Sequence, residues 1–197
     1  MWETRFATPD YVFGTEPAQF LRAHGDLLTP GASALCVADG EGRNSVFMAQ
    51  RALQVTALEY APSALAKARR LAEERGVTVD FREVDVLAHD WPDTYDIVAG
   101  IFIQVAGPHD RKRLFDGMKR SVAPGGLMLL HGYTPKQLDY GTGGPPCAEN
   151  MYTEVILRAA FVGWQIVECR AYDRELSEGR GHSGRSALID LVARKPA

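Results

Sequence analysis

Short apolar runs alternate with helical patterns through most of this chain, and this alternation limits its possible folds more than any other feature. Such alternation indicates parallel strands that are covered by helices on both faces and joined by right-handed crossovers. The ligand crevice of such a sheet lies at the carboxyl ends of its strands. The predicted strands are 34–38, 54–59, 77–86, 95–103 and 126–133, and the predicted helices between them are 43–51, 62–75 and 108–122.

The pattern changes after residue 133. A loop rich in Gly and Pro at 133–150 is followed by a predicted helix at 149–161. Two further apolar runs, 164–172 and 186–195, read as strands with a loop between them, which favours an antiparallel pair at the sheet edge. We therefore predict an α/β, Rossmann-like fold with a seven-stranded, mostly parallel sheet and an antiparallel C-terminal edge pair.

The length of 197 residues predicts a single domain with three parts. Residues 1–30 form an N-terminal arm or lid with one helix at 17–24. Residues 31–135 form the ligand-binding half, and residues 136–197 supply a substrate-side loop, a helix and the terminal strand pair.

The stretch LCVADGEGRN, residues 35–44, ends the first predicted strand and opens the first predicted helix. Gly40 and Gly42 allow a ligand to approach the backbone closely, and the helix N-terminus favours polar ligand groups. Asp39 and Glu41 would repel a pyrophosphate, so this loop suits a ligand that carries positive charge.

Two further acids stand at the ends of neighbouring strands. Glu59 ends the second strand, where an acid can accept both hydroxyls of a ribose. Asp85 lies near the end of the third strand, where it can meet an adenine amino group. Together these features predict an adenosine with a cationic tail and no phosphate, namely S-adenosylmethionine (SAM).

Several motifs resemble those of class I SAM-dependent methyltransferases, in particular the small bacterial enzymes related to tellurite-resistance and thiopurine methyltransferases. They are VADGEGRNSVFMA, VTALEYAPSALAKA, VDVLAHDW, DIVAGIF, VAPGGLMLLHGY and the tail RELSEGRGHSGRSALIDLVARK. The resemblance covers nearly the whole chain. It implies the class I methyltransferase fold, SAM as methyl donor and S-adenosylhomocysteine (SAH) as product. The cofactor contacts that it implies are Ala38, Asp39, Gly40, Gly42, Arg43, Asn44, Glu59, Tyr60, Asp85, Val86, Ile101 and Phe102.

The chain departs from the family pattern at two positions. Family members usually carry an acid where this chain has Cys36, and a glycine where it has Ala38. The acid commonly helps to hold the methionine amino group, so that task falls here to Asp39, Glu41 or backbone carbonyls. Ala38 permits a tight turn but not a backbone angle restricted to glycine. Cys36 itself reads as a buried core thiol.

The residues after the fourth strand, 100–111, are expected to line the methyl-donor end of the site. They lack the Asn/Asp-Pro-Pro-Tyr motif that methylation of amino groups on nucleic-acid bases usually displays. A small-molecule acceptor, such as a thiol, a chalcogen oxyanion or a similar soft nucleophile, is therefore predicted. We expect the acceptor to be surrounded by three segments, 11–16, 133–146 and 178–184. The predicted substrate contacts in the first two segments are Tyr11, Phe13, Gln137 and Gly144.

The candidate catalytic residues are His182, His109 and Tyr133. His182 lies in a predicted Gly-rich loop, where a functional role and a surface turn are equally compatible with the sequence. His109 has an alternative role in capping the helix at 108–122. His131 lies inside a predicted strand, which favours a structural histidine.

Charge and cysteine content narrow the classes of partner. The formal net charge of −3 gives no electrostatic footprint for nucleic acid or anionic membranes. The three cysteines are far apart and show no zinc or redox spacing, so we predict no metal and a cytoplasmic setting. The sequence demands no partner chain, and we expect a monomer or a weak homodimer.

Two other functions remain open at this point. An NAD(P)-dependent oxidoreductase also places an acid after a glycine loop, although acids within the loop argue against it. A non-catalytic SAM-binding module is the second alternative, and the departures at Cys36 and Ala38 motivate it.

Overall fold

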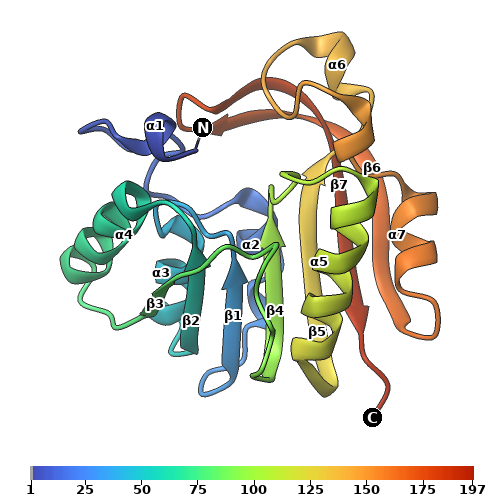
Figure 1. Cartoon of the computed structure of the whole chain (residues 1–197), viewed down its shortest axis with the longest axis horizontal. Coiled ribbons are helices and arrows are strands. Elements are labelled where there is room, and N and C mark those ends of the chain that lie inside the picture. The colour runs from blue at the N-terminus through green and yellow to red at the C-terminus, as the bar shows by residue number, and fades with distance from the viewer. Residues whose placement is uncertain (1) are drawn as a thin grey trace.

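The computed structural model describes residues 2–197 and contains a seven-stranded sheet with helices on both faces (Figure 1). The strand order is β3-β2-β1-β4-β5-β7-β6, and β7 runs antiparallel to both of its neighbours while the other pairs are parallel. The predicted α/β fold with an antiparallel C-terminal edge pair is confirmed. The strands are β1 (Ser33–Val37), β2 (Gln54–Glu59), β3 (Asp80–Glu83), β4 (Tyr95–Ile101), β5 (Val122–Tyr133), β6 (Gln165–Glu178) and β7 (His182–Arg194).

Helices bury the two faces of this sheet in two separate cores. One core packs α5 and α7 against the sheet, and the other packs α2 and α3 against the opposite face, as Figure 1 shows. None of the helices in residues 2–197 combines the length and apolar character that a membrane-crossing helix needs. The helices are α1 (Trp2–Phe6), α2 (Gln19–Ala23), α3 (Arg43–Gln50), α4 (Pro62–Glu74), α5 (Pro108–Ser121), α6 (Gln137–Tyr140) and α7 (Glu154–Ala160), with 3₁₀ turns at Gly25–Leu27 and Ala148–Asn150.

Helix α4 illustrates why these segments are helical. Pro62 begins it, at a position where no backbone N–H is needed. Leu65, Ala68 and Leu71 recur at helical spacing and are all buried. Gly76 follows the end of the helix with a φ of +66°, the left-handed conformation common after a helix.

The position of the site follows from the strand order. The strand order reverses at β1: β2 and β3 follow on one side of it, and β4 lies on its other side. A ligand crevice of a doubly wound sheet forms at such a point, beyond the carboxyl ends of the strands. In Figure 1 these ends lie at the top of the sheet, next to α1.

The C-terminal strand pair is longer than predicted. β6 continues to Glu178 and β7 begins at His182, with the last cross-strand pair between these two residues. The predicted loop between residues 172 and 186 is therefore wrong. The hairpin continues beyond the last pair of β5 with β7, Tyr133 with Leu188, and Figure 1 shows this extension curving over the top of the molecule.

Other boundaries also differ. β3 is shorter than the predicted 77–86 because it is an edge strand that pairs only with Thr56–Glu59 of β2. α7 begins only after Thr153, whose side-chain oxygen caps the helix by accepting a hydrogen bond from the N–H of Ile156. The arm contains α1 in addition to the predicted helix at 17–24, which is observed as α2.

Candidate functional site

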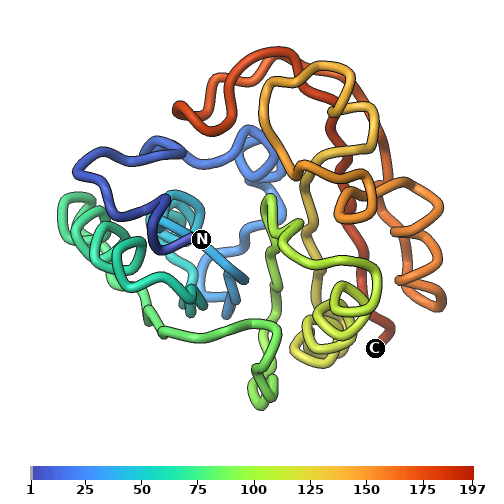
Figure 2. The backbone as a smooth tube through the Cα atoms, turned by 45° about the horizontal axis from the view of Figure 1, so that its top comes forward, coloured from blue at the N-terminus to red at the C-terminus, as the bar shows by residue number. Residues whose placement is uncertain are grey.

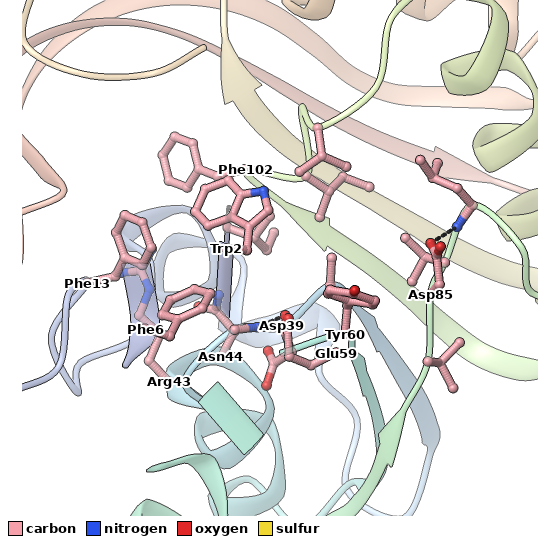
Figure 3. A pocket seen from close by; sticks show the side chains of 18 of the residues that line it. Trp2, Phe6, Phe13, Asp39, Arg43, Asn44, Glu59, Tyr60, Asp85 and Phe102 are labelled. Atoms are coloured by element: carbon pink, nitrogen blue, oxygen red, sulfur yellow. Dashed lines mark hydrogen bonds between the residues drawn. The ribbon is translucent and has the colours of Figure 1, made fainter. Parts of the chain in front are cut away.

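A cavity of about 370 Å³ lies at the carboxyl ends of the central strands. Its volume falls in the range of small-molecule sites, roughly 300–1,000 Å³. All of the residues predicted to contact the cofactor line it, except Gly42. Figure 3 shows Trp2, Phe6, Phe13 and Phe102 gathered on one side of this cavity and Asp85 on the opposite side, with Tyr60 beside Glu59.

Gly42 shapes the loop from behind the cavity. It precedes α3 with a φ of +88°, a left-handed conformation that favours glycine. A Cβ at this position would lie 2.7 Å from the Cβ and 2.8 Å from the Cα of Ala68 in α4. The glycine is therefore needed both for its backbone angle and for the close approach of α4.

Glu59 is held at the end of β2 by two backbone amides. Its Oε2 accepts a hydrogen bond from the N–H of Gly40 and its Oε1 accepts one from the N–H of Ala61, both at 2.8 Å. Burial raises the pKa of this carboxyl, although the amide hydrogen bonds oppose the rise. The remaining lone pairs are available for two neighbouring hydroxyls of a ligand.

Asp39 lies at the start of the glycine loop. Its carboxylate accepts hydrogen bonds from the N–H and the hydroxyl of Ser45 in α3. Burial raises the pKa of Asp39 to about 6, and the nearby Glu59 carboxylate adds to the rise. A bound cation would reverse this effect, because a positive charge favours the ionised carboxyl.

Asp85 follows β3 and is exposed at the far side of the cavity. Its Oδ1 accepts a hydrogen bond of 2.9 Å from the N–H of Leu87, which fixes the carboxylate. Val84, Val86 and Leu87 line the same part of the cavity with apolar groups. This wall suits a flat apolar ring that carries a hydrogen-bond donor at its edge.

The cavity has a negative balance of charge. Within residues 2–197, neither Asp39, Glu59 nor Asp85 forms a salt bridge. Arg43 lines the cavity, but its charge is balanced by Glu178 of β6 in a buried pair at 2.8 Å. Such a lining favours a cationic ligand over a phosphate.

Glu41 does not have the role expected from the sequence. Its carboxylate is buried and forms a 2.7 Å salt bridge with Lys67 of α4. It also accepts hydrogen bonds from the backbone N–H groups of Val12 and Phe13. The expectation that Glu41 faces a positively charged ligand is therefore wrong. Its carboxylate instead binds the N-terminal arm to the glycine loop and to α4.

Aromatic residues of this arm form one wall of the cavity. Phe13 was a predicted substrate contact, but Trp2 and Phe6 were not predicted from the sequence. The rings of Trp2 and Phe6 stack at 5.7 Å, and Phe6 meets Phe13 edge-on at 6.1 Å. The sequence does contain a pattern that could have indicated them: Trp2 and Phe6 are four residues apart, which places both rings on one face of a helix.

The other half of this wall comes from the hairpin tip. The N–H of Gly181 donates to the carbonyl of Val12, so the arm and the hairpin are joined by a main-chain hydrogen bond. Figure 2 shows the two segments, from opposite ends of the sequence, lying side by side. We refer to residues 10–14 and 178–182 together as the clasp.

His182 occupies the clasp as the first residue of β7, so its predicted place in a loop is wrong. It is buried, lines the cavity and packs against Phe13 and Phe102 at centroid distances of 4.4 and 4.0 Å. Burial holds the pKa of His182 well below its usual range, and Arg43 lowers it further. The imidazole is therefore neutral.

The remaining predicted site residues lie outside the cavity. His109 is exposed on α5, and Gly144 is exposed in the loop after α6. Gln137 is buried and accepts a hydrogen bond from the N–H of Ala187, so it ties this loop to β7. Tyr11 donates its hydroxyl proton to the carbonyl of Lys67. Tyr133 is buried behind Phe102, at a centroid distance of 4.9 Å.

Ala38 adopts a φ of +48°, a left-handed conformation that an alanine can adopt only with some strain, in the tight turn expected at this position. We expect Ala38→Gly to raise the free energy of unfolding by about 0.5–1 kcal/mol, since an alanine in this region is strained. Urea denaturation measures the change. Ala49→Gly, within α3, is the control and should lower the same free energy by about 0.5–1 kcal/mol. A loss of stability in both variants would contradict the strain at Ala38.

No group of three or more His, Cys, Asp or Glu side chains in residues 2–197 is arranged to hold a metal ion. Cys36 is buried in the core below the cavity, beside the sulfur of Met48, and burial raises the pKa of its thiol.

Residues 34–126 match a family model described as a methyltransferase domain. The chain is 35% identical over 104 residues to a demethylmenaquinone methyltransferase of Thermus thermophilus, covering 51% of this chain and 47% of the relative. It is 33% identical over 102 residues to a ubiquinone biosynthesis O-methyltransferase of Pseudomonas paraeruginosa, covering 51% and 44%. The chain thus spans about half the length of the curated relatives that it matches.

Solved structures share the fold over most of the chain. TehB from Haemophilus influenzae superposes with a TM-score of 0.74 at 16% identity, covering 98% of this chain and 65% of TehB. The N-methyltransferase NodS from Bradyrhizobium japonicum, in complex with S-adenosyl-L-homocysteine, superposes with a TM-score of 0.73 at 15% identity, covering 100% and 97%. The chain therefore has the fold of these methyltransferases, and its residues 34–126 match the methyltransferase-domain model.

Proposed function

We propose that this protein binds SAM in the cavity and transfers its methyl group to a small-molecule acceptor. The observation that carries the proposal is the juxtaposition of Asp39, Glu59 and Asp85 around one cavity, with no salt bridge to any of them within the described chain. A nucleoside with a cationic tail and no phosphate complements this arrangement. The SAH complex of NodS, which shares the fold, supports the same ligand class.

The residues have distinct tasks in this proposal. The two oxygens of Glu59 accept the ribose hydroxyls, and Asp85 accepts from the adenine amino group while Val84 and Val86 cover the ring. Asp39 faces the positive charge of the methionine part. When bound, SAM supplies an already activated methyl group on its sulfonium, so the protein mainly has to orient the two reactants and exclude water.

The acceptor is a small molecule that enters beside the aromatic wall. A soft nucleophile such as a thiol or a chalcogen oxyanion fits the proposal, as does a phenolic hydroxyl, given that one relative is named a ubiquinone biosynthesis O-methyltransferase. Membership of the tellurite-resistance and thiopurine subgroup is part of this proposal. It is supported by the tail motif, since Glu178 pairs with Arg43 and His182 lines the cavity.

Calorimetric titration with SAH, followed by incubation with labelled SAM and a panel of thiols, phenols, chalcogen oxyanions and amines, tests the function. Binding in the micromolar range and methylation of at least one class are expected. Binding without methylation would favour the non-catalytic module, and binding of a nicotinamide dinucleotide in place of SAH would favour the oxidoreductase.

Cofactor affinity is expected to depend on pH through Asp39. Because its pKa is raised to about 6, the carboxyl is protonated below that pH, whereas a cationic ligand needs it ionised. Affinity for SAM should therefore fall, by at most about tenfold per pH unit, as the pH drops from 7 to 5. Calorimetry over this range measures the change, with adenosine as a neutral control that shares any effect of Glu59 on the ribose and should show the smaller slope. Equal slopes for the two ligands would contradict the role of Asp39.

A further inference from the structure

Three buried polar atoms without a hydrogen-bond partner surround the ring of Phe102. Among the described residues they are Nε2 of His131, the hydroxyl of Tyr133 and Nδ1 of His182. The Phe102 ring lies 4.6 Å from the ring of His131, 4.9 Å from that of Tyr133 and 4.0 Å from that of His182. A buried polar group without a partner destabilises the folded state. Three such groups around one side chain indicate a site for a polar ligand.

His131 is held as a proton acceptor. Its Nδ1 lies 2.6 Å from Oδ1 of Asp190, and a carboxylate can only accept, so Nδ1–H donates and the neutral imidazole has its lone pair on Nε2. Tyr172 donates a second hydrogen bond to the same Oδ1 at 3.2 Å. Phe20 stacks on the imidazole at 5.2 Å with an interplanar angle of 6°. The ring is thus fixed on one side by a carboxylate and on its face by an aromatic ring.

Phe102 separates this group from the cavity. Phe102 and His182 line the cavity, whereas His131 and Tyr133 do not and are almost fully buried. Phe102 has a φ of +58°, an uncommon conformation for a bulky residue. Its N–H donates to the carbonyl of His131 at 2.8 Å, which anchors its backbone. Such strain often marks functional positions.

We propose that the space filled by the Phe102 ring is the site of the acceptor's nucleophilic hydroxyl, and that His131 takes the proton from this hydroxyl. The ring of Phe102 swings aside when the acceptor enters. Tyr133 donates its hydroxyl proton to the acceptor oxygen, and Asp190 is a positioning residue that keeps Nε2 free. The acceptor is a planar, hydroxyl-bearing ring compound, because Trp2, Phe6 and Phe13 line the adjoining cavity.

This inference rests on the proposed function, because the proton transfer is followed by formation of the bond between the acceptor oxygen and the methyl carbon. The acceptor's O–H bond breaks, its proton moves to Nε2 of His131, and its electron pair stays on oxygen. That pair then forms the bond to the methyl carbon, while the pair of the former methyl–sulfur bond remains on sulfur. The proton leaves His131 for water, so the cycle needs no further reactant.

The charged groups around the site suit a transient imidazolium at His131. Asp190 of β7 contacts it directly. Arg43 of α3 is neutralised by Glu178 of β6, and the opposing charge of Arg5 in α1 is directed to the rings of Trp2 and Phe13. Burial keeps His182 neutral and Tyr133 protonated, since it lowers the pKa of the first and raises the pKa of the second.

The test uses the full-length Phe102→Ala variant with 4-nitrophenol, and nitrobenzene as the matched ligand without the hydroxyl. We expect 4-nitrophenol to bind about tenfold more tightly than nitrobenzene in calorimetry, because only it satisfies the unpartnered atoms. At a pH where free 4-nitrophenol is protonated, the bound form should show the absorbance of the nitrophenolate, which reports proton transfer to His131.

The control replaces both members of the buried pair in the same background, as Phe102→Ala/His131→Leu/Asp190→Val. Both the preference for 4-nitrophenol and the nitrophenolate absorbance should disappear. Equal binding of the two ligands to Phe102→Ala, or an unchanged absorbance in the control, overturns the proposal. If Phe102→Ala does not fold, Phe102→Leu decides by the same two readings. These titrations use no cofactor. The proposed function is tested by a separate experiment, the titration of the wild type with SAH, so the two failures can be distinguished.

Discussion

Replacing Gly42 with valine is expected to abolish measurable cofactor binding, with a loss of affinity of about 100-fold or more. Valine would need the left-handed backbone at a φ of +88°, which costs about 1–2 kcal/mol for a residue with a Cβ. Its Cβ would also lie 2.7 Å from the Cβ of Ala68, so α4 and the loop would have to separate, at a further cost of about 1–3 kcal/mol. Displacing the loop moves Gly40, whose N–H orients Glu59, and that residue is the proposed ribose acceptor.

Calorimetry with SAH measures the affinity, and thermal unfolding measures the stability. Gly76→Val is the matched control, because Gly76 has a φ of +66°, a Cβ there would meet nothing within 4 Å, and the residue lies away from the cavity. This control should lose about 1–2 kcal/mol of stability and no cofactor affinity. An equal loss of SAH affinity in the two variants would show that the loop geometry at Gly42 has no special role.

The second large effect is expected for Glu41→Ala. The substitution leaves the ammonium group of Lys67 buried without its carboxylate partner, and breaking a buried pair in this way costs about 3–5 kcal/mol. It also removes the acceptor for the backbone N–H groups of Val12 and Phe13, so the arm should detach from the loop.

Urea denaturation measures the stability, and the fluorescence of Trp2 reports the arm. The emission should shift to longer wavelength as Trp2 meets water, while Trp91 remains in the core. Glu74→Ala is the control, because its pair with Arg70 is half-exposed and is worth at most about 0.5 kcal/mol. A Glu41 variant as stable as the control would show that the clamp contributes nothing to folding.

The sequence predicted the fold well because hydrophobic periodicity reports which face of each element is buried. The alternation from residue 34 on indicated the order of the parallel strands, and the turn to an antiparallel edge was visible in the last two apolar runs. The end of the hairpin was not predictable in this way. Its residues 173–178 are mostly polar, and a polar run reads as a loop.

The candidate site was predictable where its residues follow directly from strand ends. Glu59 and Asp85 were found because the carboxyl ends of neighbouring parallel strands meet at one edge. Glu41 was misread because a carboxylate in a glycine loop has the same sequence pattern whether it faces a ligand or a lysine on another helix. The pairing of His131 with Asp190 joins residues that are 59 positions apart, so only tertiary structure reveals it.

The clasp has a consequence for how the sequence can vary. Val12 and Gly181 are joined by a backbone hydrogen bond, although they stand near opposite ends of the chain. A Cβ on Gly181 would meet the ring of Phe13 at 2.2 Å, so the two segments fit each other by shape as well. Substitutions in one segment will therefore be epistatic to substitutions in the other. Related proteins should exchange the two segments only as a matched set, and chimaeras that mix them should lose the wall of the cavity.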